Sequence, residues 1–179
     1  VQAAHMMGRR VTAHAHGTDG INAALRAGVD SIEHGTYIDR DSIRMLRQGN
    51  RYLVPTMMAG WWVGQLAERG GVLTPAQTEK ARRVGPDLVR MVRTARAAGV
   101  RMAFGTDTGV SPHGMNAREF QLLVEAGYTP IQTLQMATVN AADHLQVSTI
   151  TGRIAPGMAA DIIALDGDPT RDVTTLMNV

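Results

Sequence analysis

The sequence predicts an α/β fold built on a parallel sheet, and three observations favour this fold class. Short apolar runs typical of strands alternate four times with amphipathic segments typical of helices. The spacing of these segments suits right-handed crossovers between neighbouring parallel strands. Apolar residues make up 44% of the 179 residues and charged residues 19%, a composition that can fill a core and argues against disorder.

The expected elements follow one another in a regular order. The strands are expected at residues 9–17, 29–35, 51–56 and 100–109. The helices are expected at residues 19–28, 39–50, 74–99, 116–127 and 129–146, with a loop containing Trp61 and Trp62 before the third helix. Thr74 and Thr129 suit N-caps because a proline follows each of them. Pro86 should divide or kink the third helix, and residues 151–169 should form strand within a separate small β element.

Composition and charge exclude several classes of partner and site. The formal net charge is only +2 and the arginines are scattered, so we expect no nucleic-acid partner. The chain has no cysteine, which excludes a disulfide framework and a cysteine-based zinc site. No apolar stretch approaches membrane-spanning length, so we expect no membrane partner. Without an initiating Met or a signal core, both ends look cut, and the compartment stays open between cytoplasm and periplasm.

Ionisable side chains stand at the carboxyl ends of three expected strands. His14, His34 and Asp107 each follow a short apolar run. The carboxyl ends of parallel strands share one edge, which is where such folds bind ligands and carry out catalysis. Two imidazoles and a carboxylate are good ligands for zinc and similar ions, and a carboxylate there can also transfer the proton of an attacking water. We therefore expect a metal site at this edge, although a single histidine at a strand end is usually structural.

Two further polar residues lie beside these positions. His16 points the same way as His14 only if the strand is still extended there, and a direct role for it stays open. Glu33 should lie on the opposite face from His34, because side chains alternate along a strand. We expect Glu33 to make a structural hydrogen bond or ion pair between strand and helix.

Four motifs, in order along nearly the whole chain, resemble the amidohydrolase superfamily: HAHGTDGINAALRAGVDSIEHG, FGTDTG, ATVNAADHL and GRIAPGMAADIIALDGDP. The branch that they resemble is that of the imidazolonepropionase-related metallopeptidases, which includes prolidases and Xaa-Arg dipeptidases. The resemblance implies the second half of a (β/α)8 TIM-type barrel (strands 5–8) at residues 1–147. Residues 148–179 would then be part of a small β-sandwich.

The resemblance also implies roles for individual residues. His14 and His34 match the metal ligands of strands 5 and 6, and Asp107 matches the strand-8 aspartate that binds metal and shuttles the proton. Tyr37 matches a tyrosine that contacts the terminal carboxylate of the substrate. His113, in the loop after strand 8, is a second candidate for substrate binding. The implied cofactor is a divalent metal, zinc above all, as one or two ions.

The family pattern also includes an HxH pair on strand 1 and often a bridging lysine on strand 4, and neither is visible. HAHG is itself an HxH, but only one βα unit separates it from EHG, too few for a strand-1 position. Lys80 lies in a polar helical stretch and does not match the bridging lysine. A half barrel has unpaired edge strands, so we expect the isolated 179 residues to bind metal weakly and to have no turnover.

The resulting hypothesis is a metal-dependent hydrolase that cleaves the amide bond of a dipeptide or N-acyl amino acid, homo-oligomeric at full length. One alternative is a cyclic-amide hydrolase, imidazolonepropionase-like, or a deaminase. Deaminases generally carry an HxxE-like motif after the strand-5 histidine, which this chain lacks. The other alternative is a non-catalytic barrel scaffold or an inactive fragment, against which the three retained ligands count.

Overall fold

The computed structural model describes residues 1–179 and contains one four-stranded sheet in which every pair of strands is parallel. The strands follow chain order, with β1 (Thr12–Ala15), β2 (Ser31–His34), β3 (Tyr52–Val54) and β4 (Arg101–Met102) side by side. This arrangement confirms the predicted α/β fold with a parallel sheet. Within this chain β1 and β4 are edge strands, because each pairs on one side only.

The two faces of the sheet differ in chemistry. Ile32, Leu53 and Met102 belong to the main apolar core and are almost fully buried. The opposite face carries the register pair of His14 on β1 and Glu33 on β2. Because side chains alternate along a strand, one face of the sheet is thus packed against helices and the other presents polar groups.

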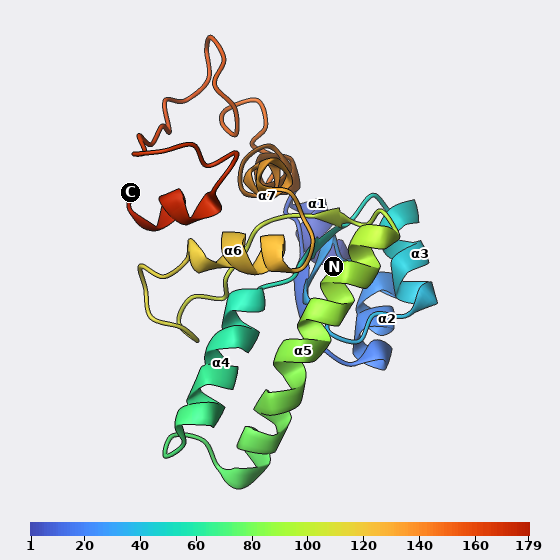
Figure 1. The fold of residues 1–179 in the computed structure, drawn as a ribbon. Coiled ribbons are helices and arrows are strands. Elements are labelled where there is room, and N and C mark those ends of the chain that lie inside the picture. The colour runs from blue at the N-terminus through green and yellow to red at the C-terminus, as the bar shows by residue number, and fades with distance from the viewer.

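The connecting segments are helical. They comprise α1 (Gln2–Met6), α2 (Thr18–Arg26), α3 (Arg40–Gln48), α4 (Met57–Arg69), α5 (Pro75–Ala97), α6 (Arg118–Glu125), α7 (Pro130–Gln135), the π-helical η1 (Met136–Asn140), α8 (Ala141–His144) and the 3₁₀-helical η2 (Val173–Met177). Helices α4 and α5 run side by side and extend together away from the sheet (Figure 1). No helix is both long and apolar enough to cross a bilayer.

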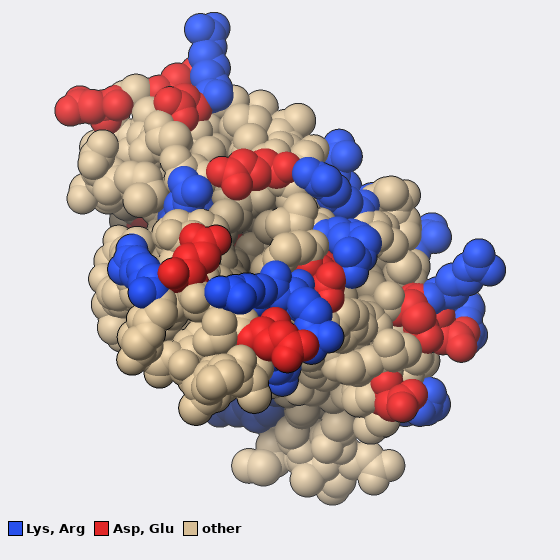
Figure 2. All heavy atoms as spheres, turned by 60° about the horizontal axis from the view of Figure 1, so that its bottom comes forward, with Lys and Arg blue, Asp and Glu red and all other residues tan.

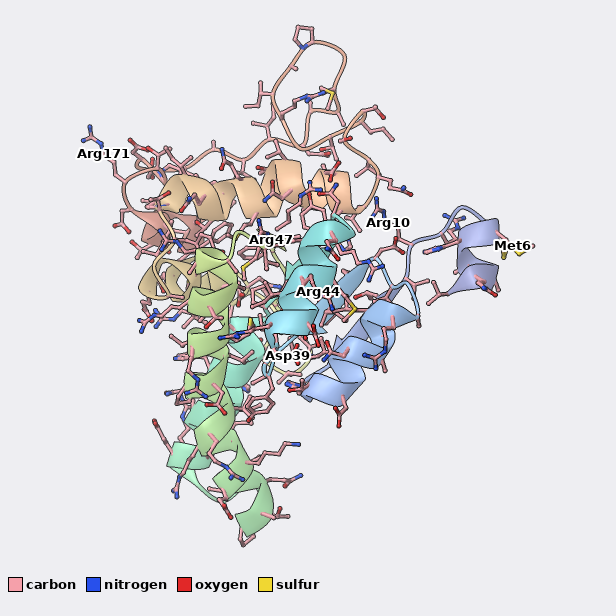
Figure 3. The ribbon with its side chains drawn as sticks, turned by 90° about the vertical axis from the view of Figure 1, so that its right-hand side faces the viewer. Met6, Arg10, Asp39, Arg44, Arg47 and Arg171 are labelled. Carbon is pink, nitrogen blue, oxygen red and sulfur yellow. The ribbon has the colours of Figure 1, made fainter.

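Capping residues fix where several helices begin. Asp39 accepts a hydrogen bond from the backbone N–H of Ser42 at 2.7 Å, which closes a capping box at the beginning of α3 (Figure 3). Thr74 and Thr129 form the same type of box before α5 and α7, each with a proline in the first turn. These two predicted N-caps are confirmed.

One local prediction was wrong, and a second was wrong in one of its two alternatives. The segment with Trp61 and Trp62 is the helix α4 and not a loop, because it packs along α5. A Cβ at Gly60 would lie 2.4 Å from the Leu88 side chain, so this glycine allows the two helices to approach closely. Pro86 does not divide α5. Its ring is exposed, where water can satisfy the carbonyl that loses its helical partner.

Helix α7, η1 and α8 form one continuous helical rod where a single helix was expected at residues 129–146. The rod covers part of the free edge beyond β4. The Phe104 N–H donates to the Met136 carbonyl at 3.1 Å, and the Asn140 side-chain amide donates to the Met102 carbonyl at 2.9 Å. Met136 and Asn140 of the rod, the second within the ATVNAADHL motif, thus satisfy backbone groups that a neighbouring strand would otherwise satisfy.

The predicted strand at residues 151–169 does not form in this chain. The segment has no helix or strand, and it passes near α7 without joining the sheet (Figure 1). Ile154, Ile162 and Ile163 are 87%, 62% and 57% exposed. A strand needs a partner for its backbone groups, and this segment has none here. The division at residue 147 stays a prediction.

Surface charge is mixed on the face drawn in Figure 2, where basic and acidic side chains lie next to one another. The chain also has ion pairs within one helix, such as Arg44 with Asp41 and Arg83 with Glu79. That face carries no continuous basic strip of the kind that follows a nucleic-acid backbone.

Candidate metal centre and substrate pocket

Side chains from the carboxyl ends of three strands gather around His34. His14 Nδ1 lies 2.9 Å from His34 Nε2, and His34 Nε2 lies 3.9 Å from Asp107 Oδ2. His34 is 7% exposed, Asp107 is partly buried and His14 faces the open side of the sheet. The structure therefore brings together the three residues that the sequence singled out.

His34 reaches His14 because the alternation of side chains along β2 ends at His34. In register it pairs with Ala15, so a fully extended β2 would place it on the face opposite His14. Its φ of 70° lies in the left-handed region, so the side chain leaves the face that alternation would give it and turns toward His14. Thr56 (φ 48°) and Asp107 (φ 53°) follow β3 and β4 and are left-handed too. Strained backbone of this kind concentrates at functional sites, and the β-branched Thr56 is the most unusual of the three.

A hydrogen bond from His34 to Thr56 fixes the orientation of the His34 ring. The Thr56 hydroxyl donates to the Pro55 carbonyl at 2.7 Å and therefore accepts from His34 Nδ1–H at 2.6 Å. His34 Nε2 is thus the unprotonated nitrogen, and its lone pair faces His14 Nδ1 at 2.9 Å. Burial, and next the neighbouring His16, lower the pKa of His34 to about 4, so the ring is neutral at physiological pH.

His16 and Glu33 make contacts of their own. His16 Nδ1 lies 2.7 Å from the Thr36 hydroxyl, and its ring stacks on His34 with centroids 4.4 Å apart. Glu33 accepts a hydrogen bond from the Thr12 hydroxyl at 2.8 Å. That bond joins two strands, so the predicted strand-to-helix contact was wrong. The reason is that Glu33 lies opposite His14 of β1 in the register, so its side chain reaches Thr12 of the same neighbouring strand.

A divalent ion fits the chemistry of His14, His34 and Asp107 in part. An ion with ligand distances of about 2.0–2.2 Å can join donor atoms up to roughly 4 Å apart, and the two measured separations, 2.9 and 3.9 Å, fall within that reach. The chain does not hold a complete site, because no group of three or more His, Cys, Asp or Glu side chains is arranged to hold a metal. The donors of this chain are therefore part of a ligand set.

A pocket of about 320 Å³ opens beside these residues. His16, His34 and Asp107 form its polar end, and α4 and α5 supply most of the remaining wall. The larger aliphatic side chains of the lining are Val63, Leu73, Val84, Leu88 and Val110. A small molecule with an apolar group can thus lie against α4 and α5 with a polar bond near Asp107.

The structure separates the two predicted substrate-binding residues. Tyr37 lines the pocket, and its hydroxyl donates to Asp87 of α5 at 2.8 Å. His113 is exposed and is not among the residues that line the pocket. Lys80 does line it, and after burial its charge is the second cause that lowers the pKa of His16. Lys80 takes part in no ion pair or hydrogen bond of the chain, so its ammonium group is available to a ligand.

Sequence reasoning missed Thr56 and Lys80. Thr56 could have been found by the rule that selected His34, since it is the polar residue that follows the third strand. Lys80 gave no such signal, because it lies in the polar stretch QTEKARR of α5 and only the packing of α5 over the site brings it near. Gly105, in the FGTD motif, allows close packing, since a Cβ there would lie 2.4 Å from the Val54 side chain.

Comparison with known proteins decides the family. The sequence model of the amidohydrolase family matches residues 1–179, the whole length of the chain. The chain belongs to the amidohydrolase family. This amidohydrolase is 34% identical over 176 residues to an ochratoxinase of Aspergillus niger, covering 97% of this chain and 36% of that protein.

Solved structures agree with this family. The crystal structure of a Xaa-Pro dipeptidase with methionine bound in its active site has a TM-score of 0.95 and 39% identity, covering 99% of this chain and 44% of that one. A prolidase in complex with N-methylphosphonate-L-proline has a TM-score of 0.88 and 28% identity, covering 99% of this chain and 43% of that one. The parallel sheet with its helices thus matches part of a TIM-barrel amidohydrolase. The chain spans less than half the length of these relatives.

Proposed function

We propose that the protein is a metal-dependent hydrolase that cleaves the amide bond of a dipeptide or an N-acyl amino acid. The observation that carries this proposal is the approach of His14 and Asp107 to His34, with His34 and Asp107 lining a partly apolar pocket. The similarity to a Xaa-Pro dipeptidase and to a prolidase supports the substrate class. The four strands then correspond to strands 5–8 of the barrel.

His14 and His34 are the proposed metal ligands, together with Asp107. Zn²⁺ is the proposed ion, as one or two ions completed by ligands from elsewhere in the protein. When bound, it supplies a Lewis acid that polarises the scissile carbonyl and lowers the pKa of water. Asp107 accepts the proton of the attacking water at its carboxylate and then delivers it to the leaving amine nitrogen.

Lys80 is the proposed main anchor for the substrate carboxylate, and Tyr37 is a second one once its hydroxyl leaves Asp87. Both line the pocket with His34, and Lys80 has no anionic partner within the chain. An ammonium group on a flexible stem suits a carboxylate as a point charge. The aliphatic wall favours an apolar amino acid at this end of the substrate, and Lys80 disfavours a cationic one.

The substrate proposal is tested with Lys80→Met in the intact protein, assayed on an apolar dipeptide and on the same dipeptide with a C-terminal amide. We expect KM for the free acid to rise about tenfold, the order of one lost charge-assisted hydrogen bond, with little change for the amide. The control is Arg83→Met, which lies on the same helix and pairs with Glu79 at 3.6 Å on the surface. Equal KM changes for acid and amide would contradict the role of Lys80.

The reaction class needs a separate test. Metal analysis of the intact protein, combined with assays on apolar dipeptides, N-acyl amino acids, cyclic amides and aminated rings, distinguishes the proposal from its rivals. Turnover of cyclic amides alone would identify a ring hydrolase, and release of ammonia from a ring would identify a deaminase. A protein that binds zinc and turns over none of these compounds would instead support the scaffold.

A further inference from the structure

Glu119 is a buried carboxyl group that the proposed chemistry does not use. It lies on α6, is 0% exposed and has no cationic side chain paired with it. Its two oxygens accept hydrogen bonds from two successive backbone N–H groups: Oε1 from Met57 at 3.0 Å and Oε2 from Met58 at 2.6 Å. Burial raises the pKa of Glu119, and these two backbone donors oppose the rise.

These two donors belong to the first turn of α4. The first N–H groups of a helix have no partner within the helix, and the side chain of the N-cap residue normally satisfies one of them. The N-cap of α4 is Thr56, and its side chain makes no capping bond. Glu119 therefore caps α4 from another helix, where the positive end of the helix dipole also favours an anion.

This arrangement leaves the Thr56 hydroxyl free for His34. The hydroxyl accepts from His34 Nδ1–H at 2.6 Å instead of bonding to the helix. The Met57 N–H that Glu119 holds belongs to the peptide that joins Thr56 to Met57. Glu119 thus fixes the peptide plane next to a threonine with a φ of 48°, a conformation that threonine rarely adopts.

We propose that Glu119 is a positioning residue that sets the tautomer and direction of the His34 ring through the first peptide of α4 and Thr56. The inference rests on the proposed function in one respect, that His34 is a metal ligand. Outer partners of ligating histidines typically change metal affinity by about 10–100-fold when removed. Glu119 acts one step further out, so we expect the lower end of that range.

The test compares Glu119→Gln with Glu125→Gln in the intact protein. Glu125 lies on the same helix but is exposed and pairs only with Arg118 at 3.6 Å. In Glu119→Gln the new side-chain amide can accept from one of the two backbone donors but turns its own N–H groups toward the other, so the first turn of α4 must shift. Three readouts are taken: the ¹⁵N shifts of His34 in metal-free protein, the Zn²⁺ affinity by chelator competition, and thermal unfolding.

We expect Glu119→Gln to populate the second His34 tautomer and to weaken Zn²⁺ binding about tenfold, with Glu125→Gln unchanged in both. If Glu119 only stabilises the fold, its variant melts earlier but keeps the native His34 tautomer and Zn²⁺ affinity, and the proposal is overturned. Should Glu119→Gln not fold, Glu119→Asp keeps a carboxyl group but is one methylene shorter and reaches fewer donors, and the same readouts decide. Failure of the intact wild type to bind Zn²⁺ would refute the proposed function alone, because the tautomer measurement needs no metal.

Discussion

Thr56→Val removes the hydrogen bond that orients His34, together with the bond from the same hydroxyl to the Pro55 carbonyl. Valine keeps the β-branched shape and hence the backbone strain at this position, and it removes only the hydroxyl. His34 is 7% exposed and Thr56 is 2% exposed, so water cannot replace the lost acceptor and the Nδ1–H stays buried without a partner. Such a loss costs about 1–3 kcal/mol of unfolding free energy. A histidine ligand that loses its outer partner loses about 10–100-fold in metal affinity.

The assay for Thr56→Val combines thermal unfolding with Zn²⁺ competition on the intact protein. The matched control is Thr133→Val, because Thr133 is 0% exposed and its hydroxyl donates to the Pro130 carbonyl at 2.8 Å, away from the metal centre. We expect both variants to lose stability and only Thr56→Val to lose Zn²⁺ affinity. Equal Zn²⁺ affinity in the two folded variants would refute the reasoning from the His34 tautomer.

Three further predictions follow from the site and the sheet. Asp107→Asn keeps the shape but cannot take up a proton, so kcat on a dipeptide should fall by about 10²–10⁴ while the fold survives; unchanged kcat would exclude the shuttle. Asp39→Ala should cost about 0.5–2 kcal/mol, measured by denaturant unfolding against the exposed Asp41→Ala. The hydrogen bond from the backbone N–H of Ser42 lowers the pKa of Asp39. The stability that Asp39 contributes is therefore present above the ordinary aspartate pKa and is lost as pH falls through the lower folded value. Wild type and variant should thus have the same unfolding free energy in acid. The isolated residues 1–179 should bind Zn²⁺ weakly and show no turnover, since β1 and β4 each lack a partner strand; turnover by this fragment contradicts that expectation.

The parts of the fold that could be predicted are those with a strong local signal. The prolines after Thr74 and Thr129 marked two helix beginnings, and the alternation of apolar runs with amphipathic segments gave the parallel sheet. Helix α4 was missed because its signal is tertiary. It begins where Glu119 caps it from α6, and it is stabilised by packing along α5, with Gly60 at the contact.

The candidate site also has one part that the sequence predicted and one part that it did not. Strand ends predicted that His14, His34 and Asp107 would meet, and their side chains do meet. The alternation rule alone would have separated His34 from His14, since their positions are one residue out of register. Only the left-handed backbone at His34 brings the rings together, and no sequence pattern of a non-glycine residue announces that conformation.

Left-handed backbone at or beyond the ends of β2, β3 and β4 suggests how side chains from several strands can gather at one edge of the sheet. His34 is the last residue of β2, whereas Thr56 and Asp107 lie beyond the ends of β3 and β4, and all three have a left-handed φ. Each such residue costs about 1–3 kcal/mol, which persists only where surrounding contacts hold it. For Thr56 the structure shows those contacts, namely the hydroxyl bonds to His34 and Pro55 and the Glu119 bond to the next peptide. Thr56 therefore carries both the backbone strain and the contacts that hold it. Substitutions at Thr56 or Glu119 should thus disturb metal binding more than their distance from the metal would suggest.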